Sequence, residues 1–85
     1  MDSHQKVWNA IDTIVWRARL SPSGLAKTAG MDATAFNRSK RVHTRGRQRW
    51  PNVETIQKSF DATGTTWSAF ARLVEEGPPA VSQRD

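Results

Sequence analysis

The stretch that decides the fold is Ser21–Arg38, which reads SPSGLAKTAGMDATAFNR. Its opening Ser-Pro pair is typical of a helix start, because serine caps exposed amides and proline suits the first helical position. Gly30 can end that helix in a left-handed conformation. The stretch therefore predicts two short helices, over 22–29 and 33–40, joined by a three-residue turn.

The third-helix segment, 33–40, carries one bulky aromatic residue among small and polar ones. If Phe36 packs inward with Leu25 and Ala29, the rest of that segment faces solvent. This is the arrangement of a helix-turn-helix, whose second helix enters the major groove of DNA. The residues that we expect to face the bases are Ala33, Thr34, Asn37 and Arg38.

Apolar residues at helical spacing predict three further helices around this pair. The first covers about 3–20, and the others cover 53–62 and 67–75, where Asn52 and Thr66 can act as caps. The expected buried face of the helix over 53–62 comprises Val53, Ile56 and Phe60. No stretch alternates with the period of a strand. We therefore expect an all-α fold, a compact domain of five helices.

Positive charge is concentrated in one place. The 85 residues include 13 Lys and Arg and 8 Asp and Glu, a formal net charge of +5, and six of the basic residues fall within 38–49, which has no acidic residue. The stretch 41–51 lacks periodicity and predicts an extended basic loop. Such a cluster is typical of nucleic-acid binding, on the DNA backbone or in the minor groove. The residues that we expect to contact the backbone are Ser23, Lys27, Lys40, Arg41, His43, Arg45, Arg47, Arg49 and Asn52.

The chain is long enough for one domain. We expect a DNA-binding domain over 1–76, with the helix-turn-helix at about 22–40 and the basic loop at 41–51. The remaining residues, 77–85, begin with Gly-Pro-Pro and predict a flexible tail or linker.

Several function classes have no support in the sequence. Cysteine is absent, and the two histidines do not have metal-ligand spacing, so we expect no metal and no cofactor. The sequence shows neither a pair of carboxylates nor a nucleophile-base dyad at catalytic spacing, so we do not expect an enzyme. No apolar run approaches the ~20 residues needed to span a bilayer. We expect a cytoplasmic, nucleoid-associated protein.

The pattern Leu25-Ala26-x-x-Ala29-Gly30-Met31-Asp32, followed by Phe36-Asn37-Arg38, resembles the core of the lambda-repressor-like (Xre-type) helix-turn-helix family. The run from Trp50 to Ile56 resembles that family's fourth helix, and the run from Thr63 to Trp67 resembles its step into a fifth. More narrowly, the chain is similar to the N-terminal domains of bacterial LexA/CI-like phage repressors.

This resemblance implies a transcriptional regulator, a repressor, that binds double-stranded DNA sequence-specifically as a homodimer on an inverted repeat. It also implies a C-terminal peptidase-like domain beyond these residues. Two alternatives remain open. One is an antitoxin-like protein-interaction module that also binds DNA, with an exposed apolar patch around Trp8 and Trp16. The other is an RNA-binding helical module.

Overall fold

The fold is all-helical in the part of the chain that the computed structural model describes, residues 2–42 and 46–77 except the side chain of Arg38. No strand occurs in that part, which confirms the all-α class. The helices are α1 (Ser3–Arg17), α2 (Pro22–Thr28), the short 3-10 helix η1 (Arg38–Lys40), α3 (Val53–Thr63) and α4 (Trp67–Glu76).

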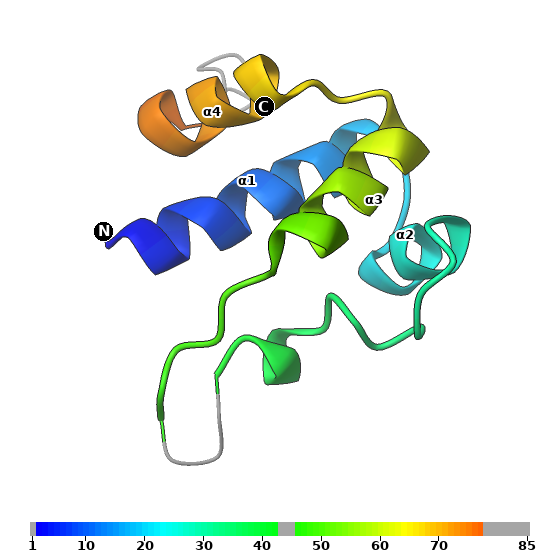
Figure 1. Cartoon of the computed structure of the whole chain (residues 1–85), viewed down its shortest axis with the longest axis horizontal. Helices are drawn as coiled ribbons and strands as arrows, with labels where there is room; N and C mark the ends of the chain where they lie inside the picture. The colour runs from blue at the N-terminus through cyan, green and yellow to red at the C-terminus, as the bar shows by residue number, and fades with distance from the viewer. Residues whose placement is uncertain (1, 43–45, 78–85) are drawn as a thin grey trace.

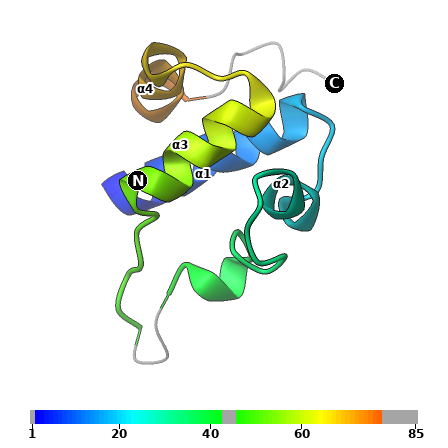
Figure 2. The ribbon, with the colours of Figure 1, turned by 45° about the vertical axis from the view of Figure 1, so that its right-hand side comes forward.

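The longest helix, α1, runs through the middle of the molecule (Figure 1). It packs against α4 on one side and against α2 on another, and α2 also packs against α3. The described residues between α2 and α3 lie on the far side of the molecule from α4, and they include η1 and the two ends of the basic loop (Figure 2). None of the described helices has both the length and the apolar character that a membrane span needs.

The apolar core joins all four α-helices. Leu25, Phe36 and Ile11 have no measurable exposure, which confirms that Phe36 packs inward. The other buried apolar residues are Trp8, Ala10, Ile14, Val15, Ala26, Ile56, Phe60, Phe70 and Leu73. The expectation that Val53 lies on the buried face of α3 is wrong, because it is the first residue of the helix and its side chain is exposed.

Side-chain caps start the helices where the sequence predicts them. Ser21, Asn52 and Thr66 each accept a hydrogen bond from the backbone amide three residues later. Each of these bonds satisfies an amide that has no partner within its helix. The left-handed Gly64, with φ of 72°, ends α3.

The end of α1 comes earlier than expected, at Arg17 rather than near Leu20. Arg19 adopts a left-handed conformation with φ of 60°, and the Leu20 amide donates to the Val15 carbonyl at 3.1 Å. This is the hydrogen-bond pattern of a Schellman closure, in which a left-handed residue turns the chain out of the helix.

The predicted helix over 33–40 is not confirmed as an α-helix, and neither is the helix-turn-helix. Residues 33–36 form turns, and only η1 follows. The backbone bonds span three residues rather than four, from Ala35 to Asp32, from Asn37 to Thr34 and from Lys40 to Asn37. The sequence therefore forms four of the five expected α-helices.

Two side chains compete with helix formation in this segment. The Asp32 carboxylate accepts from both the amide and the hydroxyl of Thr34, at 2.8 and 2.6 Å, which favours a local turn. An α-helix would bond the Phe36 carbonyl to the Lys40 amide. Instead that carbonyl accepts from the Arg41 guanidinium at 3.1 Å, and the Lys40 amide turns to Asn37.

Candidate nucleic-acid interface

The basic loop is closed at its base by backbone pairing. The Arg49 amide donates to the Arg41 carbonyl at 2.8 Å, and Val42 and Gln48 form an antiparallel bridge. We call these four residues, Arg41, Val42, Gln48 and Arg49, the loop base. The predicted extended loop therefore has a paired base. His43 and Arg45, which we expected to contact the DNA backbone, lie outside the described residues.

Arg41 is buried, contrary to the prediction that it contacts the DNA backbone. It is only 7% exposed, and its guanidinium forms two hydrogen bonds with Asp12, at 2.7 and 3.0 Å. It also lies over the Trp8 ring, 4.6 Å from the ring centroid. The Asp12 carboxylate and the Trp8 ring both stabilise this charge, while the buried Nε has no hydrogen-bond partner among the described residues. Because its charge is already paired and buried, Arg41 holds the loop base on α1 and is not available to a phosphate.

His4 provides a second attachment of the loop base to α1. Its Nε2 lies 3.0 Å from the Arg41 carbonyl oxygen and 2.8 Å from the Arg49 carbonyl oxygen, and the residue is 8% exposed. Two carbonyls can only accept, so Nε2 must carry a proton and donate. Trp8 Nε1, also a donor, bonds the Arg49 carbonyl at 3.0 Å. Its 3.1 Å approach to His4 Nε2 is therefore a contact between two donors.

The sequence analysis missed His4, Trp8 and Asp12 as a unit. They are spaced four residues apart on α1, so they share one face of the helix. That spacing of three side chains with hydrogen-bonding groups was the available signal. Their partners, Arg41 and Arg49, however, lie 29 to 45 residues away in the sequence. No local sequence pattern identifies such distant partners.

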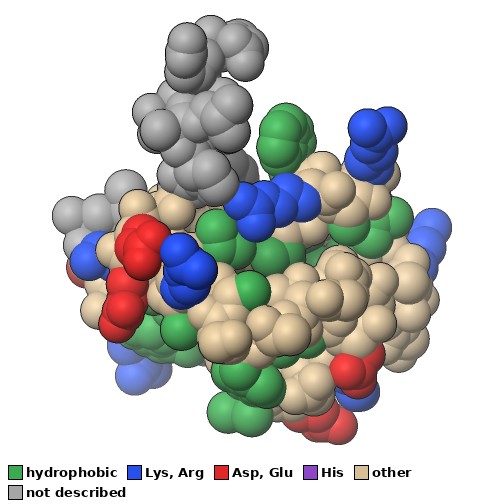
Figure 3. Space-filling view, turned by 90° about the horizontal axis from the view of Figure 1, so that it is seen from above, with side chains coloured by type: hydrophobic (Ala, Val, Ile, Leu, Met, Phe, Trp, Pro, Cys, Tyr) green, Lys and Arg blue, Asp and Glu red, His purple; other side chains and the backbone are tan. Residues whose placement is uncertain are grey.

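Four of the expected backbone-contact cations are exposed: Lys27, Lys40, Arg47 and Arg49. In the part of the chain that the structure describes, no carboxylate pairs with them. By contrast, the surface around α4 carries acidic and basic side chains close together (Figure 3), including the Arg72–Glu76 pair at 3.8 Å. Positive charge without a salt-bridge partner among the described residues thus lies on α2, on η1 and on the basic loop.

The remaining expected contacts have mixed positions. Ser23 is exposed and shares a hydrogen bond with Ser21 at 3.2 Å. Asn52 is exposed, but its side-chain oxygen caps α3. Among the expected base-contact residues, Thr34 is exposed, and Ala33 and Asn37 are half-buried. The fourth, Arg38, begins η1, and its side chain lies outside the described atoms.

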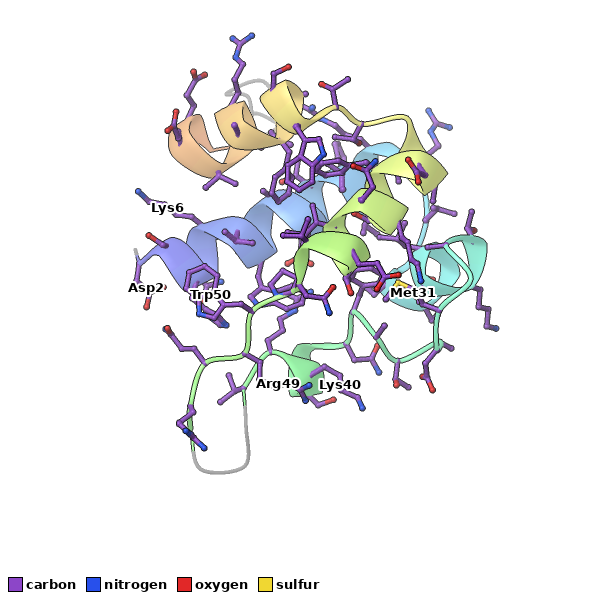
Figure 4. The ribbon with its side chains drawn as sticks, viewed as in Figure 1. Asp2, Lys6, Met31, Lys40, Arg49 and Trp50 are labelled. Carbon is purple, nitrogen blue, oxygen red and sulfur yellow. The ribbon has the colours of Figure 1, made fainter. Side chains whose placement is uncertain are left out.

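A pocket of about 300 Å³ joins several of these residues. Its walls come from Trp8, from the turn at 31–35, from Lys40 and from the chain between Arg49 and Thr55. Figure 4 shows Arg49, Lys40 and Met31 on one side of this chain and the Trp50 side chain on the other side. Hydrogen bonds from the Thr34 hydroxyl and amide lower the pKa of the Asp32 carboxyl, so the pocket contains a carboxylate as well as two cations.

No metal centre is apparent in the described ranges, 2–42 and 46–77: no three His, Cys, Asp or Glu side chains come together there. Comparisons of the chain with protein-family models, with curated proteins and with solved structures gave no match. Function is therefore argued from the geometry above.

Proposed function

We propose that this protein binds double-stranded DNA at specific sequences and acts as a transcriptional regulator, a repressor. The observation that carries the proposal is a group of exposed cations, Lys40, Arg47 and Arg49, beside the polar turn that holds Thr34 and Asn37. None of the three has a salt-bridge partner within the described ranges. A cation surface of this kind favours association with a polyanion, because each neutralised phosphate releases counterions.

In this proposal the turn at 33–37 takes the place of a recognition helix in the major groove. Apart from the buried Phe36, its side chains are small or short and polar, so the backbone can approach the base edges. The half-buried Asn37 amide is suited to adenine, which presents an acceptor and a donor in the major groove. The loop then lies along the phosphates or in the minor groove.

The attachment of the loop base to α1 supports this arrangement. His4, Trp8 and Asp12 fix the backbone next to Arg47 and Arg49 through bonds of 2.7 to 3.0 Å. A surface ordered before binding loses less conformational entropy when it binds. We further propose that two copies bind an inverted repeat, with half-site centres about 34–36 Å apart.

The test is the salt dependence of duplex binding by the triple variant Lys40→Ala, Arg47→Ala, Arg49→Ala. For each phosphate that the variant no longer neutralises, the slope of log K against log[salt] should become shallower by about 0.9. The matched control is Arg72→Ala, which removes an exposed arginine of α4 that already pairs with Glu76. Equal slopes for the wild type, the triple variant and the control would contradict the proposal.

Specificity has its own measurement. Sequences enriched from a random duplex pool should bind Asn37→Ala about 5- to 150-fold more weakly, the range that corresponds to one good base contact. Binding to an unrelated duplex should stay unchanged. A protein that prefers RNA to every duplex in competition would instead favour the RNA-binding alternative.

The protein-interaction alternative has one observation in its favour. Trp16 is 69% exposed and lines a surface hollow with Arg17, Arg19 and Leu20. The wider apolar patch that this alternative needs is not formed, because Trp8 is buried under Arg41. Recovery of a stoichiometric protein partner that no longer binds Trp16→Ala would favour this alternative over DNA binding alone.

A further inference from the structure

The C-terminal end of α1 carries an apolar and basic surface that the proposed duplex contacts do not use. Trp16 is 69% exposed, and it lines a hollow of about 540 Å³ together with Arg17, Arg19 and Leu20. A tryptophan side chain left in water forgoes a large favourable free energy of burial. This hollow therefore has an apolar wall that the described residues leave uncovered.

Arg17 also lines a second hollow, of about 260 Å³, so its side chain lies between the two. The buried side chains of Ile14 and Leu73 contribute to this second hollow. Hydroxyl-bearing residues from the turn between α3 and α4 also contribute, namely Thr63, Thr65 and Thr66. We call the two hollows together the α1-end groove. It combines apolar walls with an arginine at its centre.

The α1-end groove is positively charged, and no acidic residue compensates that charge within the described ranges. Neither hollow is lined by Asp or Glu there, and no carboxylate pairs with Arg17 or Arg19. Arg72 on α4, by contrast, pairs with Glu76. Charge of one sign on a surface favours a partner of the opposite sign and disfavours others.

Arg19 occupies a position that suits glycine better than arginine. Its φ of 60° is left-handed, and glycine adopts this conformation at helix ends without the clash that a side chain makes. The Arg19 side chain is exposed, and it has no ion pair in residues 2–42 and 46–77 that would offset this cost. An unfavourable conformation that the fold does not offset points to a contact with another molecule.

The α1-end groove lies at the opposite end of the molecule from the candidate interface. The helix α3 begins beside the pocket that Lys40 and Arg49 line, and it ends at Thr63 beside the groove. Its 11 residues span about 16 Å. The ends of α1 and α3 accordingly lie away from the two ends of the basic loop (Figure 1). A molecule in the groove thus leaves Lys40 and Arg49 accessible.

We propose that the α1-end groove binds an acidic peptide segment of a partner protein. An apolar side chain of the segment packs against Trp16 and Leu20, and its carboxylates bind Arg17 and Arg19, because arginine and carboxylate form strong charge-assisted hydrogen bonds. A nucleic acid would use the arginines but not the apolar walls. The proposal adds a protein partner to the proposed function and does not depend on DNA binding.

Two other occupants fit the groove less well. A small molecule would remain largely in water beside the exposed Trp16, whereas small-ligand sites bury about 70–90% of the ligand surface. A second copy would have to supply acidic residues such as Glu75 and Glu76, which lie at the opposite end of α4 from Thr66. Such a heterologous contact builds rings or open chains rather than a symmetric pair.

The experiment selects short random peptides displayed on phage against the whole chain without DNA, and then measures the enriched peptides by fluorescence anisotropy. Enriched peptides should carry acidic residues next to a bulky apolar one. Arg17→Gln and Trp16→Ala should each weaken their binding about tenfold or more, the effect of losing a central arginine or tryptophan anchor. The matched control is Arg72→Gln, which makes the same change in an arginine that pairs with Glu76 and should leave peptide affinity unchanged.

Arg19→Gly separates a binding role from a structural one. Glycine relieves the left-handed strain, so the melting temperature should rise, while peptide affinity should fall with the loss of the guanidinium. A lower melting temperature with unchanged peptide affinity would contradict the proposal. Circular dichroism establishes that each variant is folded, and Trp16, Arg17 and Arg19 are all exposed.

The proposal is overturned if selection yields no peptide, if the enriched peptides are not acidic, or if they bind Trp16→Ala and Arg17→Gln as tightly as the wild type. Other occupants have their own readouts in the same variants. A shallower salt dependence of duplex binding in Arg17→Gln would assign the arginine to nucleic acid. A tryptophan fluorescence shift on phosphatidylserine vesicles, lost in Trp16→Ala, would assign the groove to a membrane. A larger mass in sedimentation, lost in Trp16→Ala, would assign it to a second copy.

Each of these three results in the absence of peptide binding overturns the proposal. Because the peptide measurements contain no DNA, their failure leaves the proposed function standing. Acidic-peptide binding by a protein that binds no duplex would do the reverse.

Discussion

Two neighbouring faces of α1 are held to the rest of the chain by different chemistry. On one face, Ile11 and Ile14 pack into the apolar core with α2 and α4. On the other face, His4 and Asp12 bind the loop base through hydrogen bonds and a salt bridge. One helix therefore stabilises the fold with one face and positions the candidate interface with the other.

The apolar core and the polar contacts to the loop base should therefore respond differently to mutation. Apolar packing is non-directional, so the core tolerates small shifts but loses free energy in proportion to the area exposed. The polar contacts depend on direction and on having every buried group paired. Damage to the core should unfold the whole domain, whereas damage to the polar contacts should first release the loop base.

The largest effect is expected from Ile11→Ala. Ile11 is fully buried, and the truncation leaves a cavity that costs about 2–5 kcal/mol of unfolding free energy. Urea denaturation should show this loss with an unchanged m-value. Lys6→Ala, on the exposed side of the same helix, is the control and should change stability by less than about 0.5 kcal/mol. Similar losses in both variants would contradict a core centred on α1.

A smaller loss is expected from Asp12→Asn, which leaves the buried Arg41 charge without its carboxylate. Removing one partner of a fully buried pair costs about 3–5 kcal/mol. Asp12 is 34% exposed, so we expect about 2 kcal/mol. The matched control is Glu76→Gln, which makes the same chemical change in an exposed pair and should cost at most about 0.5 kcal/mol.

Arg41→Lys sharpens the same comparison, because lysine keeps the charge but cannot form the two-bonded pair. Stability should fall toward that of Asp12→Asn. If Asp12→Asn and Glu76→Gln instead had equal effects, the Arg41 pair would be an ordinary surface contact and the loop base would need another anchor.

Most of the helical framework was predictable from local rules. Caps at Ser21 and Asn52 and the burial of Phe36 follow from residue type and spacing. The error at Val53 has a simple cause, because the spacing rule does not register that a residue at the helix end lies at the border of the core. These features involve neighbours within a few residues in the sequence.

The candidate site was less predictable, because its contacts are between distant residues. A helix over 33–40 requires the Phe36 carbonyl to stay within the helix, and Arg41 takes that carbonyl only because Asp12 and Trp8 hold its guanidinium in place. The charge cluster correctly predicts exposed cations at Lys40 and Arg49. It could not indicate that Arg41, within the same cluster, is buried.

The third prediction concerns His4→Ala, which removes the donor shared by the Arg41 and Arg49 carbonyls. The Arg41 carbonyl keeps the Arg49 amide as a donor, and the Arg49 carbonyl keeps Trp8 Nε1. The free energy of unfolding should therefore fall by only about 1 kcal/mol. Hydrogen exchange of the Arg49 amide should accelerate, while amides of α3 keep their protection. His4→Gln supplies a new N–H donor and should restore part of the protection of the Arg49 amide. Equal acceleration in α3 would show that the loop base and the core open together.

The smallest effect is an acid-dependent loosening at the start of α1. Asp2 caps the helix by accepting from the Gln5 amide at 2.9 Å and also accepts from the Gln48 side chain at 2.8 Å. These bonds, the Gln5 one foremost, lower the pKa of the Asp2 carboxyl below 3.8. Their stabilising effect is therefore complete above pH 3.8 and is lost as the pH falls through the lowered value.

Asp2→Asn is the matched variant, since asparagine caps helices as well as aspartate but does not titrate. The wild type should be slightly more stable than Asp2→Asn near pH 7, and thermal melts followed by circular dichroism should show this advantage vanish as the pH falls below 3.8 and through the lowered pKa. Asp32 also has a lowered pKa, but it is present in both proteins and cancels in the difference. Parallel pH curves would mean that the Asp2 carboxylate does not connect α1 to the loop base, and that His4, Trp8 and Asp12 make the attachment without it.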